Sequence, residues 1–248
     1  MSDQERTGDV HIESPTRADD MVAVVEVFDS VWGSTPPVVA VELLTAVAHG
    51  GGYVALARAG DGRPVGASLG LLARHDGAPA LHSHVTGLVP DARGTGAGRA
   101  LKLHQRDWAA AHGLDLIVWT FDPLVRRNAW FNLEVLGTEV REYLPSFYGT
   151  MSDAINAGDR SDRLLVVWDV RRPVRGAGDV GTTPGVGVAA RASLVPTPAD
   201  VVDLRRTDPA AVARWRNEVA DALQGAFAAG RPIIGFTRAG EYVIGSRP

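Results

Sequence analysis

The spacing of apolar residues predicts two helices near the start of the chain. Residues 10–13 alternate as a short strand does, and residues 14–16, Ser-Pro-Thr, are expected to cap a helix. Apolar residues then recur every three or four positions, as one face of a helix requires, until Gly33. They are Met21, Val24, Val25, Phe28, Val31 and Trp32. A second helix is predicted over residues 37–49, ended by three glycines.

Three strands and an amphipathic helix are predicted next. Residues 53–58 and 64–73 are apolar runs joined by Ala-Gly-Asp-Gly, which is a hairpin signal. Residues 80–89 form the third strand, and a glycine-rich turn leads from it into a helix that Gly113 ends. The apolar face predicted for this helix consists of Ala97, Leu101, His104, Trp108 and Ala111.

A compact apolar run, residues 116–121, is typical of a buried parallel strand. We expect it to lie beside residues 80–89, because a right-handed crossover through the helix would join the two. A helix over residues 126–136 and strands over residues 138–144 and 164–170 complete this part of the chain.

The C-terminal part begins with a change in composition. Residues 172–187 are rich in Gly, Pro, Thr and Val without a period, which indicates a linker or loop. Asp208-Pro209 then begins a helix, and residues 233–237 and 242–244 can pair as a hairpin. The helix presents Val212, Trp215, Val219, Leu223 and Phe227 on one face. About 60 residues are marginal for an independent core, so this extension is expected to dock on the main domain. The predicted organisation is a flexible N-terminus (1–9), a main domain (10–171), a linker or loop (172–187) and a C-terminal extension (188–248).

Composition narrows the class of protein. The 248 residues are 45% hydrophobic and 22% charged, as in a soluble globular chain. The net charge of −4 comes without a basic stripe, so no nucleic acid partner is expected. The absence of cysteine excludes disulfides, thiolate zinc sites and a cysteine nucleophile. The N-terminus is polar and no apolar run reaches the ~18 residues that span a bilayer, so a cytoplasmic protein without membrane contact is predicted.

The glycine-rich turn is the strongest chemical signal. Gly94, Gly96 and Gly98 allow backbone N–H groups to converge on an anion at the start of a helix, where donors are unpaired and the dipole is positive. That arrangement suits a pyrophosphate. A dinucleotide fingerprint would need glycine at position 99, where Arg99 stands. A P-loop would need Gly-Lys-Ser/Thr, yet the only lysine, Lys102, does not follow a glycine.

The pattern that fits is R-x-x-G-x-G, Arg93-Gly-Thr-Gly-Ala-Gly98, preceded by residues 88–92. It resembles the acyl-CoA-binding motif of the GNAT superfamily of N-acyltransferases, and the resemblance extends over about residues 10–170. It implies an α+β, layered fold, in which a mixed central sheet splays between two parallel strands and is flanked by helices, here with a C-terminal helix-plus-hairpin extension. The implied donor is acetyl-CoA or another acyl-CoA, such as succinyl-CoA, with no metal.

A narrower resemblance lies in residues 117–124, 127–128, 148–158 and 161–163. These segments are similar to an uncharacterised GNAT branch, some of whose members occur beside N-succinylamino acid racemases and acylate amino acids. The resemblance implies transfer of an acetyl or succinyl group to a small amine, an amino acid being one candidate.

The GNAT resemblance also implies roles for individual residues. Leu88 and Val89 would pair their backbone with the pantetheine arm, and the Leu88 N–H, at a strand splay or bulge, would donate to the oxyanion. Asn128 would reach the pantetheine amide, with a helix N-terminal cap as the equal alternative. The pyrophosphate would be held by Arg93, Gly94, Thr95, Gly96, Ala97, Gly98 and Arg99.

One position departs from the family pattern. Leu133 stands where many GNAT enzymes carry a tyrosine that protonates the leaving thiolate. One possibility is that no proton donor is needed, because a thiol with a pKa of ~8.5 is a tolerable leaving group near neutral pH. The other is that the donor is Tyr148 or Tyr143 from the next loop. Tyr148 is the candidate, against the alternative of an ordinary loop aromatic.

Two histidines are the candidate general bases. His82 and His84 titrate near neutral pH and share a strand face with Thr86 and Leu88 unless a bulge intervenes. The alternative is that they are hydrogen-bonded packing residues. No third histidine has a spacing that suggests a metal site. 

If the acceptor is an amino acid, a guanidinium fork could hold its carboxylate. Arg163 and Arg127 are the candidates, against the alternative of surface salt bridges. The loop at residues 156–160 carries groups that could shape a polar pocket.

Three functions therefore stay open at this point. The first is a direct, ternary-complex N-acyltransferase acting on a small molecule. The second is a non-catalytic acyl-CoA sensor or regulatory module. The third is a protein N-acetyltransferase, or a homodimer in which the extension is exchanged between subunits.

Overall fold

The chain folds into two units whose division falls inside a strand. The structure is a computed structural model that describes residues 10–33, 37–149, 159–174 and 192–246. The units are Met1–Val118 and Trp119–Pro248. The dividing strand is β5, Leu116–Phe121, so it belongs to both.

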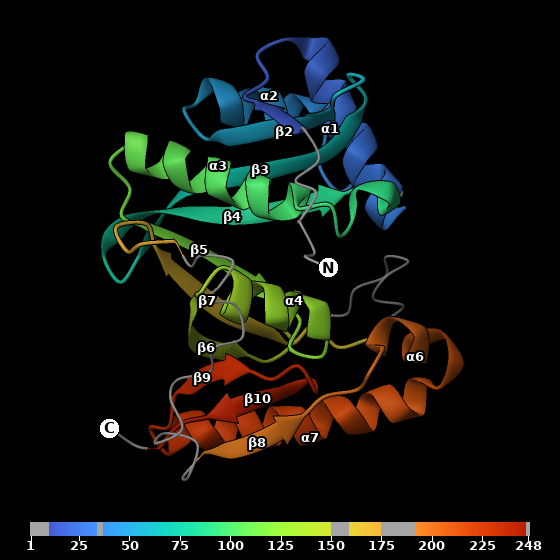
Figure 1. Cartoon of the computed structure of the whole chain (residues 1–248), viewed down its shortest axis with the longest axis vertical. Coiled ribbons are helices and arrows are strands. Elements are labelled where there is room, and N and C mark those ends of the chain that lie inside the picture. Colours follow the sequence, from blue (N-terminus) through green and yellow to red (C-terminus); the bar gives the residue numbers. More distant parts are fainter. Residues whose placement is uncertain (1–9, 34–36, 150–158, 175–191, 247–248) are drawn as a thin grey trace, which may run out of the picture. The chain divides into compact units, whose positions relative to one another are not determined.

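The first unit is built on strands β1 to β5 in sequential order (Figure 1). Neighbouring strands β1 to β4 pair antiparallel. Strands β4 and β5 pair in parallel, from Ala80 opposite Leu116 to His82 opposite Val118, and β4 continues past this last pair to Leu88. The predicted parallel pair is therefore confirmed. The antiparallel strands are β1 Val10–Glu13, β2 Tyr53–Ala59, β3 Pro64–His75 and β4 Ala78–Leu88.

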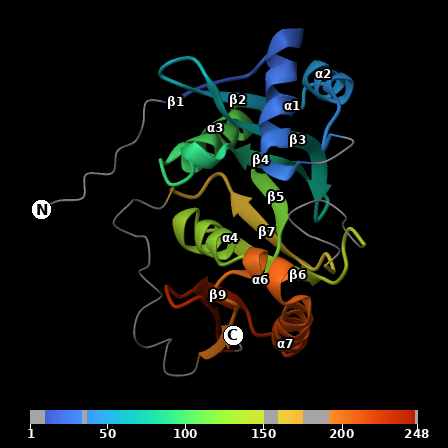
Figure 2. The ribbon, with the colours of Figure 1, turned by 90° about the vertical axis from the view of Figure 1, so that its right-hand side faces the viewer.

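Helices cover both faces of this sheet. Helices α1, Ala18–Trp32, and α2, Val41–His49, lie on one face, and α3, Ala97–Ala111, lies on the other (Figure 2). On the α1 face the buried core includes Met21, Val24, Phe28, Leu44, Val54, Leu56, Ala67 and Leu69. On the α3 face the Tyr53 ring meets the Trp108 ring edge-on, with centroids 5.3 Å apart. Together the layers and the mixed sheet confirm the predicted α+β class.

Two predicted helix starts are wrong. Helix α1 is capped at Arg17 and not at residues 14–16, and the Arg17 side chain makes no capping hydrogen bond. Helix α2 begins at Val41 rather than at residue 37, because Ala40 is still extended, with φ −77° and ψ 150°. Both predicted ends are correct, and Gly33 adopts the left-handed conformation, φ 56°, that often ends a helix.

Within the second unit the strand order is β5-β7-β6. Strands β6, Glu139–Leu144, and β7, Arg163–Asp169, pair antiparallel. The helix predicted over residues 126–136 is α4, Arg126–Trp130, which passes directly into a π-helical turn, η2, Phe131–Val135.

The C-terminal extension belongs to this second unit. The predicted hairpin is confirmed as β9, Ile233–Phe236, and β10, Glu241–Ile244, and a third strand, β8 Ser193–Pro196, was not predicted. Helix α6, Val201–Thr207, was also missed, whereas α7, Pro209–Ala228, begins as expected at Asp208, whose Oδ1 accepts the Ala211 N–H at 2.8 Å.

Buried hydrogen bonds tie the extension to the rest of the second unit. The Tyr242 hydroxyl donates to the Pro123 carbonyl at 2.8 Å, and the Phe236 N–H donates to Glu134 Oε1 at 2.8 Å. The predicted domain limits themselves stay a prediction, and most of the expected linker lies outside the described residues.

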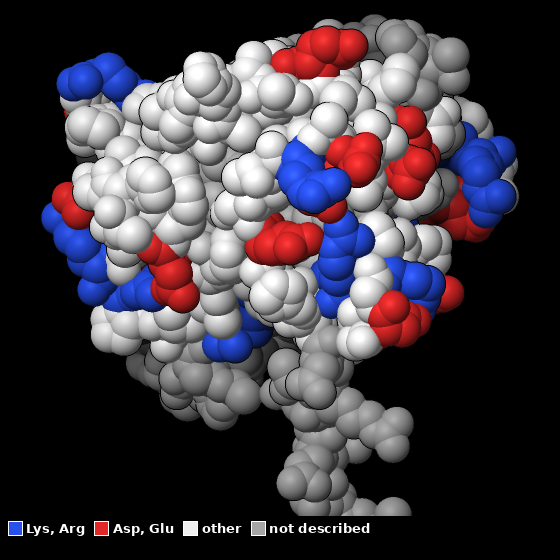
Figure 3. Space-filling model, turned by 90° about the horizontal axis from the view of Figure 1, so that it is seen from above, with Lys and Arg blue, Asp and Glu red and all other residues white. Residues whose placement is uncertain are grey.

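The surface and the helices agree with the composition. Among the described residues on the face shown in Figure 3, acidic and basic side chains are mixed and no continuous basic stripe is seen. None of the helices in the described ranges is long and apolar enough to cross a membrane.

Candidate functional site

The turn between β4 and α3 presents a row of backbone donors. It starts with a short 3-10 helix, η1 Pro90–Ala92, which uses the N–H groups of Ala92 and Arg93 at 3.0 and 3.1 Å. The first helical hydrogen bond of α3 runs from the Ala100 N–H to the Gly96 carbonyl at 3.0 Å. Between them, the N–H groups of residues 94–98 have no hydrogen-bond partner within the described part of the chain. Such donors at a helix start favour an anion.

Glycine is required where the turn is tightest. Gly96, immediately before α3, has φ 89°, a conformation that other residues rarely adopt, and no side chain caps the helix there. A Cβ atom at Gly98 would lie 3.3 Å from Leu88 Cδ1, so the helix start packs closely against the end of β4. The predicted strand, turn and helix are thus present in the predicted geometry.

The turn is open to solvent. A Cβ atom built at Gly94 would meet no atom within 4 Å among those described, and Arg93 is exposed while Arg99 is half-buried. Thr95 folds back on the turn, because its hydroxyl donates to the Ala92 carbonyl at 2.8 Å. The amides of residues 94–98 therefore fit the diphosphate of coenzyme A, since no described residue bonds them and Gly94 and Gly96 are exposed.

The end of β4 offers a further backbone donor. The Val89 N–H bonds the Val65 carbonyl of β3 at 3.0 Å. Successive N–H groups of an extended strand point to opposite edges, so the Leu88 N–H faces the edge away from β3. The role predicted for this N–H, toward the pantetheine arm or the oxyanion, stays a prediction.

The exception allowed for the strand face of the histidines, an intervening bulge, is what the structure shows. The β3–β4 register shifts between Gly70, opposite Ser83, and Leu69, opposite Val85, so His84 is the extra residue of a β-bulge. The bulge, predicted as one option at Leu88, lies at His84 instead. The extra residue shifts the alternation of β4 side chains between the two faces of the sheet, so His82 does not share a face with Thr86 and Leu88.

The two imidazoles remain neighbours and favour the neutral state. Their ring centroids are 6.1 Å apart, with His82 partly buried and His84 exposed. Partial burial lowers the pKa of His82, and the nearby charges of His84 and Lys102 lower it further. Partial burial also lowers the pKa of His84. Both can therefore accept a proton at neutral pH.

A buried polar network under α3 was not predicted. Lys102 Nζ donates to Ser83 Oγ at 2.7 Å and to Gln105 Oε1 at 3.2 Å, and Gln105 Nε2 donates to Ser68 Oγ at 3.3 Å. Ser68 and Thr86 join their hydroxyls at 2.8 Å. Burial lowers the pKa of Lys102 to about 7. The sequence signal was a lysine and a glutamine at the helical spacing of three.

The remaining candidates lie in the second unit. Val125 is the N-terminal cap of α4, so the alternative that Asn128 caps this helix is wrong; Asn128 is half-buried in its first turn. Neighbouring Arg127 is exposed. Leu133 is buried at 4% exposure.

The Tyr143 hydroxyl donates to Asp162 Oδ2 at 2.6 Å. Burial, and to a smaller extent this hydrogen bond, raises the pKa of Tyr143 far above its ordinary value.

Tyr148 and Arg163 lie together. The Arg163 guanidinium carbon is 5.4 Å from the centre of the Tyr148 ring, which is a cation–π distance. Tyr148 is 44% exposed and its backbone N–H donates to Ser161 Oγ at 2.8 Å. Arg163 is buried, donates to the Asp162 carbonyl at 2.9 Å and lies 3.9 Å from Asp122. An exposed phenol is thus available here, whereas Arg163 already faces a carboxylate.

Comparisons with known proteins bear on the family and the fold. The acetyltransferase (GNAT) domain family matches residues 3–120. A search of curated proteins found no match. The narrower resemblance to proteins beside racemases has no counterpart in these comparisons and stays a prediction.

Three solved structures share the fold. A putative acetyltransferase from Salmonella typhimurium, yncA with its cofactor acetyl-CoA, is 17% identical, covers 68% of this chain and 98% of its own, and has a TM-score of 0.53. A phosphinothricin acetyltransferase from Sinorhizobium meliloti, in complex with acetyl-CoA, is 18% identical, covers 72% and 94%, and has a TM-score of 0.53. Naa50 from Arabidopsis thaliana, in complex with a bisubstrate analogue, is 21% identical, covers 64% and 97%, and has a TM-score of 0.51.

These identities are low enough that the three structures establish the fold alone. The family match falls on the unit that carries the open glycine turn, and it ends within β5. The family match supports the predicted superfamily and enzyme class over residues 3–120: this part of the chain is similar to the GNAT acetyltransferase domain, the domain of acyl-CoA-dependent N-acyltransferases.

Proposed function

We propose that this protein transfers an acetyl or succinyl group from coenzyme A to the nitrogen of a small amine, an amino acid being the favoured acceptor. The observation that carries the proposal is the row of amides at residues 94–98, at the start of α3, which have no hydrogen-bond partner among the residues that the structure describes. Arg93 and Arg99 flank this row and add positive charge for a diphosphate. Leu88 and Val89 would hold the pantetheine arm through their backbone, and Asn128 would bond its amide.

The reaction is a direct attack in a ternary complex. The neutral amine bonds to the thioester carbon, and the Leu88 N–H stabilises the negative charge that develops on the carbonyl oxygen. The C–S bond then breaks and coenzyme A leaves as a thiolate. His84 or His82 takes the proton that the nitrogen loses, and Tyr148 is the candidate that protonates the thiolate. Arg163 or Arg127 would hold a carboxylate of the acceptor.

Leu133 favours one alternative. Its buried isobutyl group cannot donate a proton, so a non-catalytic acyl-CoA sensor is the second candidate. The chain has no cysteine, so thiol reagents detect only released coenzyme A. Acetyl-CoA or succinyl-CoA with a panel of amino acids, simple amines and peptides should release thiol with at least one acceptor. Binding without release on any of them would favour the sensor.

Gly96→Glu is expected to weaken coenzyme A binding at least about a hundredfold, because a carboxylate would face the diphosphate and a side chain would occupy a left-handed position. His84→Ala should leave binding unchanged. Calorimetry with coenzyme A measures both. Gly113→Glu is the matched control, since Gly113 also has a positive φ, 69°, but lies beyond the other end of α3. Equal loss of affinity in Gly96→Glu and His84→Ala would contradict this division of roles.

The pH dependence of turnover should report the histidines. Burial lowers the pKa of both imidazoles, so the neutral base persists below their ordinary value of 6.5. We expect kcat/KM to be level near neutral pH and to fall only as the pH drops below 6.5. In the double variant His82→Gln, His84→Gln this acid limb should disappear together with most of the activity. An unchanged pH profile in the double variant would remove the histidines from the reaction.

A further inference from the structure

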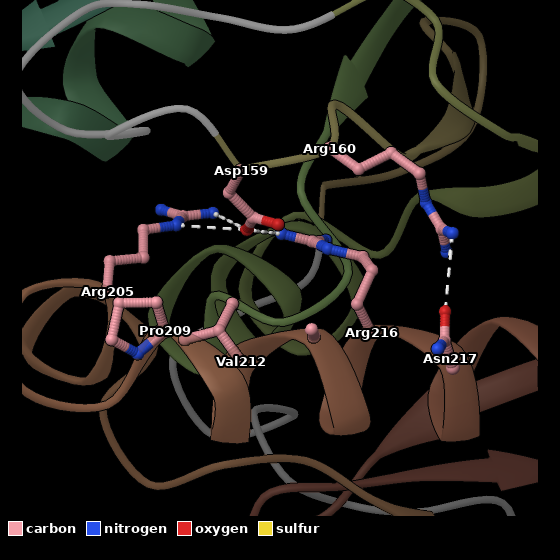
Figure 4. A pocket seen from close by; sticks show the side chains of 8 residues that line it. Asp159, Arg160, Arg205, Pro209, Val212, Arg216 and Asn217 are labelled. Atoms are coloured by element: carbon pink, nitrogen blue, oxygen red, sulfur yellow. Dashed lines mark hydrogen bonds and ion pairs between the residues drawn. The ribbon is translucent and has the colours of Figure 1, made fainter.

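A pocket of about 270 Å³ lies in the second unit, outside the residues that match the GNAT family. Its walls come from Asp159 and Arg160 on one side and from the first turns of α7 on the other (Figure 4). The loop at residues 156–160 was predicted to shape a polar pocket, and its two described residues do line one. The volume is enough for a small organic molecule.

One end of the pocket is a carboxylate held in place by buried arginines. Asp159 Oδ2 accepts Arg205 Nε at 3.1 Å and also accepts Arg216 Nη2. Both arginine side chains are 2% exposed, so they fix the position of the carboxylate. Asp159 Oδ1 has no hydrogen bond to any described residue. This oxygen can accept a bond from a ligand ammonium group.

Hydrogen-bond donors lie at the rim of the other end of the pocket. Arg160 is bound to Asp162 through Nε and Nη2, each at 2.8 Å, and its Nη1 reaches Asn217 Oδ1 at 3.3 Å, as Figure 4 shows for the last contact. The Arg160 side chain is 41% exposed. Because Asp162 occupies only one edge of the guanidinium, Nη1 and the Asn217 amide keep N–H groups that can bond a carboxylate.

Apolar side chains also line the pocket. Pro209, Val212 and Ala213 lie on the first turns of α7 and line the pocket. A carboxylate oxygen, guanidinium and amide N–H groups and an apolar wall in one pocket match a molecule with an ammonium group, a carboxylate and a hydrocarbon side chain.

We propose that this pocket binds a small zwitterion, an α-amino acid with an apolar side chain. Its ammonium group would bond Asp159, its carboxylate would bond Arg160 and Asn217, and its side chain would pack on Val212 and Ala213. Leucine is a representative of this class and serves as the probe. The proposal stands on the pocket alone and does not depend on coenzyme A binding at the glycine turn.

Calorimetric titration of the full chain with L-leucine, without coenzyme A, tests the ligand class. L-Leucinamide lacks the carboxylate and N-acetyl-L-leucine lacks the ammonium group, so each should bind at least about tenfold more weakly. Absence of L-leucine binding would overturn the proposal. Equal binding of all three compounds would also overturn it, since the charged ends would then play no part.

A pair of variants tests the location. Ala213→Trp should remove L-leucine binding, because an indole would fill the pocket from an exposed position without disturbing the buried charges. Ala210→Trp introduces the same side chain at an exposed position of the same helix that does not line the pocket, and it should bind L-leucine normally. Normal binding by Ala213→Trp would place the ligand elsewhere.

The Gly96→Glu variant separates this proposal from the proposed function. It should lose coenzyme A and still bind L-leucine. Retained coenzyme A binding in that variant would count against the glycine turn alone, whereas loss of L-leucine binding would count against an independent pocket.

Discussion

Lys102→Met is expected to raise the free energy of unfolding at pH 7 by about 2 kcal/mol or more. Lys102 is 5% exposed and burial lowers its pKa from 10.5 to about 7. A shift of this size corresponds to roughly 5 kcal/mol of penalty at and below the lowered pKa. Methionine removes this penalty, but it leaves Ser83 and Gln105 without one donor, which costs about 1–3 kcal/mol.

The pH dependence gives the sharper signature. Between pH 7 and 10.5 the unfolded lysine binds a proton that the folded one lacks, so wild-type stability should rise with pH by about 1.4 kcal/mol per unit. Urea unfolding over this range should show a much smaller slope in Lys102→Met. Arg106→Met, one turn further along α3, is the control, because arginine does not titrate in this range and the slope should persist. Equal slopes in wild type and Lys102→Met would show that Lys102 is charged in the folded state.

Asp122→Asn is expected to destabilise the protein by about 3–5 kcal/mol. Asp122 lies at the end of β5, and its Oδ1 accepts Arg216 Nη1 at 2.6 Å while its Oδ2 accepts Arg216 Nη2 at 3.0 Å and Arg205 Nη2. Burial acts to raise the pKa of Asp122, but the two arginines together hold it below its ordinary value. An amide in its place leaves buried guanidinium groups short of one negative charge.

The measurement is urea unfolding at neutral pH, with Asp203→Asn as the matched control. Asp203 pairs with Arg206 at 2.7 Å in the same unit, but these side chains are 52% and 71% exposed, so the loss should stay below about 1 kcal/mol. Similar losses for the two variants would mean that burial adds nothing to the Asp122 cluster.

The order of helices and strands could be predicted because each depends on local spacing. Helix α3 shows where this fails. The predicted apolar face included His104, Trp108 and Ala111, yet the residues most buried in the middle of the helix are Leu101, Lys102, Gln105 and Ala109. Lys102 and Gln105 are buried because Ser68 and Ser83, from two strands, supply their partners. A helical period does not contain this information.

The candidate site divides in the same way. The glycine turn could be predicted because an anion site requires a local backbone conformation that glycine favours, and Gly96 and Gly98 mark that conformation in the sequence. The bulge at His84 has no local sequence signal, since it depends on how β3 and β4 align. The contacts of Asp122 with Arg205 and Arg216 span 83 and 94 residues, and only the packing of the extension brings them together.

The burial of Lys102 has a chemical consequence for a protein that handles acyl thioesters. Thioesters acylate exposed lysine amines without any enzyme, and the damage accumulates on proteins that meet them often. Here the single lysine of the sequence is enclosed beneath α3, and every other basic side chain outside histidine is an arginine, whose guanidinium is a poor nucleophile at neutral pH. The side chains of this protein are therefore poor targets for its own acyl donor.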